Sequence, residues 1–394
     1  MKPLSGLVVL DLSRVLAGPM CTMLLSDLGA NVVKIEPYPK GDDARTNPPF
    51  IDGESSYFLS LNRGKRSIVI NLKENKGKEI FLKMVPTADI LVENFRPGTM
   101  EKLGLGYETL KPHNQGLIYC SISGFGQTGP YRDRPAYDSV IQAMSGLMSI
   151  NGYPDGLPTR AGVSISDITA GYTASVAILS GLYRREKEGK GQHIDVAMLD
   201  CMVYTLENAV SRYFATGANP RRVGNRHPIC TPFDIFKTQD GYVAIAVQNN
   251  TIWQRFCEAV QAANLFTDPR YETNATRTEH EPVLKQAIEE ILSTRTTKQW
   301  LEALIEHSVP CGPINSIGDV VTDHHILARE MIVEVEHQKL GSIKAPGVPI
   351  KFSDTKCSIG MASPVLGQHS DEILAEFGFS EGEIQMFRES NVVV

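Results

Sequence analysis

The sequence lacks the features that mark secreted, membrane-spanning and nucleic-acid-binding proteins. Its seven cysteines are scattered and include no C-x-x-C pair, which argues against a disulfide framework and against a zinc site. The apolar run at 6–10 is too short for a signal peptide, and no segment approaches the roughly 20 apolar residues of a membrane span. The net charge is −6, and no basic domain or tail is present to bind nucleic acid. We therefore expect a cytoplasmic protein with no bound metal and with neither nucleic acid nor membrane as a partner.

The composition is that of an ordinary globular protein. The chain has 394 residues, of which 42% are hydrophobic and 21% charged, so it is long enough for two or three domains. An acidic net charge still permits a local basic patch, and an anionic small molecule therefore remains a candidate ligand.

Short runs rich in β-branched residues alternate with helical patterns in the first half of the chain. Strands are expected at 7–12, 31–35, 67–71, 89–93, 117–123 and 193–198. Helices are expected at 20–28, 77–85, 168–185 and 199–217. This alternation predicts an α/β fold in which residues 1–200 form a large Rossmann-like domain around a parallel sheet.

The composition changes after this domain. A linker rich in Gly, Asn, Pro and Arg is expected within 201–224, followed by a smaller α+β domain at 225–325. In that domain, Asp240 and Gly241 predict a hairpin turn between strands at 233–236 and 242–247. Helices are expected at 251–263, 281–294 and 297–307. We expect residues 326–394 to link back and return to the large domain.

Asp167 is the only acidic residue in a long run of small and apolar residues, 161–183. Such a composition predicts a helix buried on all sides, where a carboxylate is costly unless it has a task. One interpretation is structural, because Ser164 and Asp167 have the spacing of a capping box. The other is catalytic, and the local sequence leaves both open. Cys201 and Cys230 are alternative nucleophiles, although scattered cysteines more often fill a core.

A glycine-rich motif at 124–129 matches G-x-G-x-x-G and follows a predicted strand. A dinucleotide-binding loop would open directly into a helix whose N-terminus holds the diphosphate. Here Pro130 and further turn-forming residues follow instead, so a tight loop that needs glycine is the better interpretation.

Several ordered motifs together resemble one family. They are Leu4–Pro19, Asp27–Arg45, Asn62–Lys73, Asp89–Gly98, Ser123–Pro130, Ala136–Asp138 and Asp167. This pattern is similar to the class III coenzyme A transferases, the family of formyl-CoA:oxalate and carnitine CoA-transferases. The resemblance runs essentially from residue 4 to the C-terminus. It implies a homodimer of interlocked rings, with no tightly bound cofactor and with coenzyme A entering as part of the substrate.

In this family the aspartate at the position of Asp167 is the nucleophile. The resemblance therefore implies transfer of CoA from acetyl-, formyl- or succinyl-CoA to a small carboxylic acid through an aspartyl-CoA thioester. N–H groups at the start of a helix would also stabilise the oxyanions that form there, so the capping and catalytic interpretations of Asp167 are compatible.

The resemblance also implies a set of CoA-binding positions. They are Leu16, Ala17, Ile70, Asn71, Leu72, Lys73, Asn94, Phe95, Arg96, Lys102, Ala136, Tyr137 and Asp138. Lys73, Arg96 and Lys102 suit phosphate by charge, and Phe95 suits an adenine pocket. Two positions depart from some members, because Leu16 replaces a glutamine and Pro37 an arginine.

The acceptor acid is expected to be a small dicarboxylate such as oxalate or succinate. Tyr137, Arg226 and His227 are the candidate substrate-binding residues, and ordinary structural roles for each remain open. Related racemases have a histidine where this chain has Tyr137, and a tyrosine of ordinary pKa is a poor acid or base. A racemase-like isomerase or an acyl-CoA hydrolase on the same fold is the alternative function, and a non-catalytic acyl-CoA-binding protein is a third.

Overall fold

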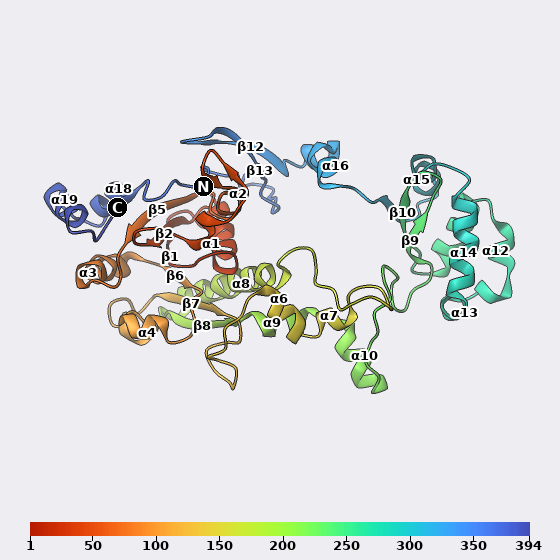
Figure 1. Cartoon of the computed structure of the whole chain (residues 1–394), viewed down its shortest axis with the longest axis horizontal. Coiled ribbons are helices and arrows are strands. Elements are labelled where there is room, and N and C mark those ends of the chain that lie inside the picture. Colours follow the sequence, from red (N-terminus) through yellow and green to blue (C-terminus); the bar gives the residue numbers. More distant parts are fainter. The chain divides into compact units, whose positions relative to one another are not determined.

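The computed structural model describes the whole chain, Met1–Val394. The chain divides into two compact units, each built from separate segments (Figure 1). The first unit comprises Met1–Leu147, Arg160–Ser211 and His324–Val394, so the C-terminal segment returns to it. The second comprises Met148–Thr159 and Arg212–Asp323. The large domain predicted from the sequence, 1–200, includes residues 148–159, but this short segment belongs to the second unit. It carries no periodic pattern that would assign it to either.

A six-stranded parallel sheet forms the centre of the first unit, in the order β5-β2-β1-β6-β7-β8. The strands are β1 (Val8–Asp11), β2 (Asn31–Pro37), β5 (Lys65–Ile70), β6 (Ile90–Glu93), β7 (Ile118–Ser123) and β8 (Gln192–Ala197). Five of them are almost entirely buried, and β8 is partly exposed at the edge. The predicted parallel sheet is therefore confirmed. Its strand order reverses direction between β1 and β6, where open sheets of this kind leave a crevice for ligands.

Helices cover both faces of this sheet. Alternate strand residues point to opposite faces, so Val9 and Val32 join one apolar cluster with α1 (Ala17–Asp27) and α8 (Ile165–Glu188). Leu10 and Val33 join the other. That second cluster includes residues of α3 (Asn75–Met84), α18 (Ser370–Glu376) and α19 (Glu381–Glu389). The returning C-terminal segment thus completes the core of the large unit.

Two helical expectations were wrong in detail. Helix α8 buries only one face, formed around Ala170, Ala174 and Ile178, whereas Tyr172, Val176 and Tyr183 on its other side are exposed. The apolar composition of this segment therefore predicted the burial of only one of the two faces of α8. The helix expected at 199–217 is two helices, α9 (Met198–Thr205) and α10 (Asn208–Thr216). Glu207 between them has φ of 52°, a left-handed conformation that does not continue a helix.

Short elements complete the first unit. They are η1 (Asp43–Thr46), β3 (Phe50–Ile51), β4 (Glu54–Ser55), α2 (Ser56–Leu61), η2 (Val85–Thr87), α4 (Thr99–Leu103), α5 (Tyr107–Leu110), α6 (Asp138–Met144), α17 (His324–Ala328), β12 (Ile332–His337) and β13 (Gly341–Pro346). Helix α7 (Leu147–Ile150) and α10 cross the division between the units. None of the helices combines the length and apolar character that crossing a bilayer requires.

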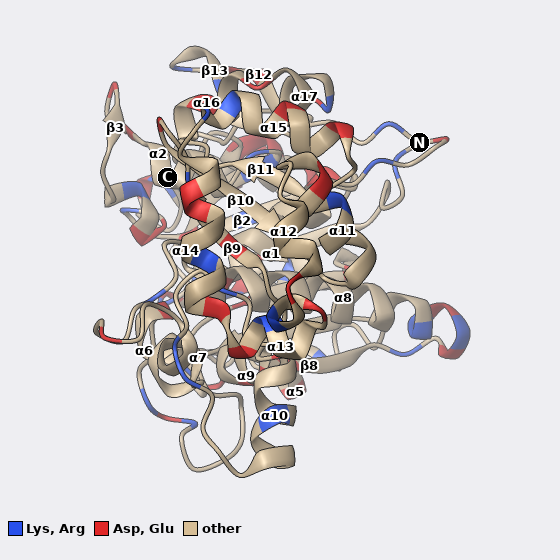
Figure 2. Cartoon of the chain, turned by 90° about the vertical axis from the view of Figure 1, so that its right-hand side faces the viewer, with Lys and Arg blue, Asp and Glu red and all other residues tan.

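The second unit has a three-stranded antiparallel sheet in the order β11-β10-β9. Its elements are β9 (Phe233–Lys237), β10 (Tyr242–Ala246), α11 (Asn250–Ala259), α12 (Ala263–Thr267), η3 (Pro269–Tyr271), α13 (Asn274–Glu279), α14 (Glu281–Leu292), α15 (Thr297–Glu306), β11 (Cys311–Pro313) and α16 (Ile317–Thr322). The predicted hairpin joins β9 to β10, and Asp240 in its turn also accepts the Thr297 N–H at 2.7 Å. Helix α14 carries both acidic and basic residues (Figure 2). One of them, Lys285, pairs with Asp234 of β9, with its Nζ 2.5 Å from Asp234 Oδ2.

Candidate active site

Asp167 lies in the first turn of α8, but it does not form the capping box that the sequence suggested. Ser164 occupies the N-cap position, and its side chain makes no capping hydrogen bond. The turn is capped from elsewhere, because Asp138 Oδ1 accepts the Ser166 N–H at 3.0 Å and the Ser166 hydroxyl at 2.7 Å. Asp138, the first residue of α6, therefore caps the start of α8, and the Asp167 carboxylate is not used for capping.

The surroundings of Asp167 favour its protonated form. Burial raises the pKa of Asp167 to about 7, and the negative charge of Asp138 adds to that rise. Burial also raises the pKa of the half-buried Tyr57 in α2 to about 12, and the negative charge of Asp167 contributes to that rise. A carboxylate of raised basicity is a better nucleophile than an ordinary one, and perturbed groups of this kind gather at functional sites.

Asp167 opens into a cavity of about 340 Å³, here called the Asp167 cavity. The segments that follow β1, β6 and β7 form much of its wall, at the point where the strand order reverses. Its lining includes Arg14, Leu16, Ala17, Asn94, Phe95, Arg96, Arg132, Ala136, Tyr137 and Met198.

A second cavity of about 450 Å³, here called the outer cavity, lies at the carboxyl ends of β2, β5 and β6. Its lining includes Tyr38, Ile70, Asn71, Leu72, Lys73, Thr99 and Lys102. Lys73 and Lys102 give this cavity positive charge. Three residues, Arg14, Phe95 and Arg96, line both cavities, so the two share a wall.

The structure brings the positions that the resemblance proposed for CoA into these two cavities. Every one of them lines the Asp167 cavity or the outer cavity, except Asp138, which instead caps α8. Their roles toward CoA stay a prediction. The sequence did not single out Arg14, although an arginine directly after the first strand of a parallel sheet stands where ligands bind.

Arg226 and His227 belong to the second unit and lie in different local settings. Arg226 lines a cavity of about 770 Å³ with Arg221, Arg222 and Lys285, and its Nε lies 3.9 Å from Glu281 Oε2. The ring of His227 stacks on Phe233 with centroids 5.0 Å apart, and its Nδ1 accepts the Ile229 N–H at 3.3 Å. His227 therefore has the local role that the sequence left open as an alternative, whereas Arg226 still faces a cavity.

The glycine-rich loop at 124–129 does not open into a helix, because α6 begins only at Asp138. A side chain at Gly124 would meet the Ala136 Cβ at 2.3 Å. Glycine is therefore needed there for the close approach of two loop segments, as the sequence suggested.

Comparison with known proteins gives one consistent result. Residues 4–370 match the model of CoA-transferase family III. The acetyl-CoA:oxalate CoA-transferase of Acetobacter aceti is 46% identical over 89% of this chain and 89% of its own length. The succinyl-CoA:glutarate CoA-transferase of Mus musculus is 40% identical over the full chain and 91% of its own length. Among solved structures, a CaiB/BaiF family protein from Brucella suis matches with a TM-score of 0.86 and 41% identity, over 95% of this chain and 99% of its own.

Proposed function

This chain belongs to CoA-transferase family III, and from that premise we propose that Asp167 is the nucleophile that carries CoA from donor to acceptor. As a member, the protein is an acyl-CoA:carboxylate CoA-transferase. The observation that supports the role of Asp167 most directly is its setting. It is an acid of raised pKa in a cavity that shares a wall with a second, lysine-lined cavity.

The proposed reaction uses the Asp167 carboxylate twice. An oxygen of Asp167 attacks the donor's thioester carbonyl, the C–S bond breaks, and CoA leaves as a thiolate while the acyl group stays on Asp167 as a mixed anhydride. The thiolate then attacks the Asp167 carbonyl carbon, which releases the donor acid and forms the aspartyl-CoA thioester. The acceptor carboxylate reverses both steps and leaves with CoA, and Asp167 is restored. No redox agent or metal is consumed.

CoA is proposed to lie across both cavities. Its nucleotide would occupy the outer cavity, where Lys73 and Lys102 offer positive charge. Its pantetheine arm would pass Phe95 and reach the Asp167 cavity beside Leu16 and Ala17. The order of these residues from one cavity to the other supports this direction, because the thioester must finish at Asp167.

The ionisation of Asp167 gives a pH prediction. Only the carboxylate attacks, so kcat/KM for the donor is expected to rise as the pH increases through about 7. Asp138→Asn should shift that rise to lower pH, because it removes a negative charge that disfavours ionised Asp167. The pH–rate profiles of both variants measure this. Asp133→Asn is the control and should show the rise in kcat/KM at the wild-type pH. If Asp138→Asn shows it at that same pH, the coupling between Asp138 and Asp167 is refuted.

We further propose that the acceptor is a small dicarboxylate. The named relatives act on oxalate and glutarate, and a second carboxylate that loses its water on binding needs a cation to pair with. By the family resemblance Arg226 is the candidate partner, and within the second unit its ion pair with Glu281 is long, at 3.9 Å.

Arg226→Gln is therefore expected to raise the KM for the acceptor much more than the KM for the donor. The loss for a buried charge pair is about 2–5 kcal/mol. Steady-state rates with acetyl-CoA or succinyl-CoA and a panel of mono- and dicarboxylic acids measure it. Arg221→Gln, in the same cavity, is the matched control. Equal activity on propionate and on dicarboxylates, with Arg226→Gln behaving as wild type, would exclude this acceptor class.

A homodimer is part of the proposal. The exposed apolar side chains Tyr172, Val176 and Tyr183 on the outer face of α8 support it. These positions are four and seven residues apart and so lie along one side of the helix; an exposed apolar face marks an interaction site, and a second copy of the chain is the partner that the family leads us to expect.

A further inference from the structure

We propose that Arg14 binds the diphosphate of CoA at the wall shared by the two cavities, held there by the buried ion pair between Lys34 and Asp42. The inference rests on the proposed placement of CoA across both cavities. It adds a binding residue that neither the sequence nor the family comparison supplied, and two residues that position it.

The Arg14 guanidinium has no close ionic partner, although it lies over the Phe95 ring with Cζ 5.0 Å from the ring centroid. It lies on the loop between β1 and α1, and it lines both the Asp167 cavity and the outer cavity. Its Nε is buried and has no hydrogen-bond partner. The ion pair with Asp43 is long, at 3.7 Å, and the Asp43 side chain is 73% exposed. A buried N–H without an acceptor is costly, so this group is suited to an acceptor that arrives with a ligand.

The connectivity of CoA selects which part of the ligand that acceptor is. Along the molecule the nucleotide comes first, then the diphosphate, then pantetheine and the thioester. If the nucleotide occupies the outer cavity and the thioester reaches Asp167, the diphosphate falls at the shared wall. Arg14 and Arg96 are the two cations that line both cavities. Guanidinium groups match phosphate oxygens in a bidentate fashion, and two of them match a diphosphate.

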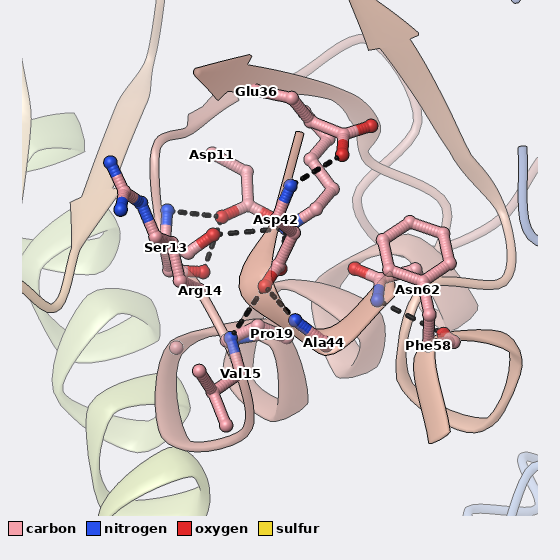
Figure 3. A network of polar contacts seen from close by, with 12 residues as sticks. Asp11, Ser13, Arg14, Val15, Pro19, Glu36, Asp42, Ala44, Phe58 and Asn62 are labelled. Atoms are coloured by element: carbon pink, nitrogen blue, oxygen red, sulfur yellow. Dashed lines mark hydrogen bonds and ion pairs between the residues drawn. The ribbon is translucent and has the colours of Figure 1, made fainter. Parts of the chain in front are cut away.

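The backbone around Arg14 is fixed on each side. Its N–H donates to Asn94 Oδ1 at 2.7 Å, and its carbonyl accepts from Asn94 Nδ2 at 2.8 Å. The next residue, Val15, has φ of 65°, and its N–H donates to Asp42 Oδ1 at 3.0 Å (Figure 3). A β-branched residue is strained in this left-handed region, and such a conformation persists only where surrounding bonds enforce it.

Lys34 ties these bonds together. Its Nζ lies 2.8 Å from Asp42 Oδ2 and donates to the Ser13 carbonyl at 2.9 Å, and the side chains of both Lys34 and Asp42 are buried. The ion pair therefore holds both neighbours of Arg14 in the chain: Lys34 binds Ser13, and Asp42 binds Val15. Figure 3 shows the Arg14 side chain pointing away from this network. The network thus fixes the backbone and leaves the guanidinium for a ligand.

Calorimetric titration of the full-length protein with CoA, dephospho-CoA and pantetheine tests the contact. Dephospho-CoA lacks the 3′-phosphate but keeps the diphosphate, whereas pantetheine lacks both. Arg14→Gln is expected to weaken CoA and dephospho-CoA equally, by roughly 10- to 100-fold, as for a lost hydrogen-bonded charge. Its effect on turnover of an acyl-pantetheine donor should be small. Arg184→Gln, which changes an exposed arginine of the same unit that pairs with Glu188 and lines neither cavity, is the matched control and should bind CoA normally.

Asp42→Asn tests the positioning role. It should weaken CoA binding although Arg14 is intact, and combining it with Arg14→Gln should add little further loss, because both changes remove the same contact. Acyl-pantetheine turnover of Asp42→Asn should stay close to wild type, which a general loss of folding would not allow.

Wild-type affinity for CoA in Arg14→Gln, or an equal loss with acyl-pantetheine, would overturn the inference. That result is distinguishable from failure of the proposed function. If only the inference is wrong, Asp167→Ala is still inactive while Arg14→Gln is normal. If the proposed function is wrong, Asp167→Ala keeps its activity.

Discussion

Asp167→Ala is expected to abolish CoA exchange while the protein still binds CoA. The substitution removes the carboxyl group whose oxygen bonds to the acyl group and whose carbon then bonds to sulfur, and loss of a nucleophile costs on the order of 10⁴-fold or more in kcat. The contacts proposed for the nucleotide lie in the outer cavity, whose lining does not include Asp167. Binding of CoA, followed by calorimetry, should therefore change little.

The matched control for this substitution is Asp133→Ala. Asp133 is a carboxylate of the loop that borders the same cavity, but its side chain is 81% exposed and pairs only with Arg132. It should turn over at close to the wild-type rate. Exchange of CoA between acetyl-CoA or succinyl-CoA and a panel of acids, read by the masses of the thioesters, measures all three proteins. Near-normal turnover in Asp167→Ala would refute the covalent route.

The largest effect on stability is expected from Asp11→Ala. Asp11 is completely buried at the end of β1, where it accepts from the Ser13 and Thr22 hydroxyls at 2.5 and 2.7 Å. It also lies 3.0 Å from Lys65 Nζ, and the Lys65 side chain is equally buried. Removing Asp11 leaves the Lys65 ammonium with neutral partners only, and a buried charge that loses its partner costs about 3–5 kcal/mol.

Urea denaturation measures this loss of stability, because Asp11→Ala should unfold at a lower urea concentration than the wild type. Adding Lys65→Met to Asp11→Ala should restore part of the stability, because the unpaired charge is then gone as well. Burial alone would raise the pKa of Asp11, but the charges of Lys65 and Lys34 and the bonds from Ser13 and Thr22 outweigh it and lower that pKa to about 2. The contribution of Asp11 is thus complete above its ordinary value of 3.8 and is lost as the pH falls toward 2. Equal stability of Asp11→Ala and wild type at pH 7 would contradict this description of the network.

The sequence was sufficient to predict the central sheet. Its strands are short, rich in β-branched residues and separated by helical patterns, and a parallel strand buried on both faces leaves that signature in the local sequence. The hairpin at Asp240 and Gly241 was equally local. The family resemblance supplied the positions around the two cavities, which no periodic pattern would have shown to lie together.

What the sequence did not reveal depends on distant contacts. Asp138 caps the first turn of α8 in place of Ser164, and nothing near either residue announces that hydrogen bond. The outer face of α8 is as apolar as its inner face, so composition predicted burial that one chain does not provide. Arg14 resembles any surface arginine until the structure places it on the wall between two cavities.

Trapping of the covalent intermediate tests the central claim most directly. The wild-type protein is incubated with acyl-CoA, treated with hydroxylamine or borohydride, digested, and its peptides are weighed by mass spectrometry. We expect a single modified peptide that contains Asp167, converted to a hydroxamate or an alcohol, and no modification in Asp167→Ala. Modification that maps instead to a cysteine such as Cys201 or Cys230, with the Asp167 peptide unchanged, would contradict the assignment of Asp167 as the nucleophile.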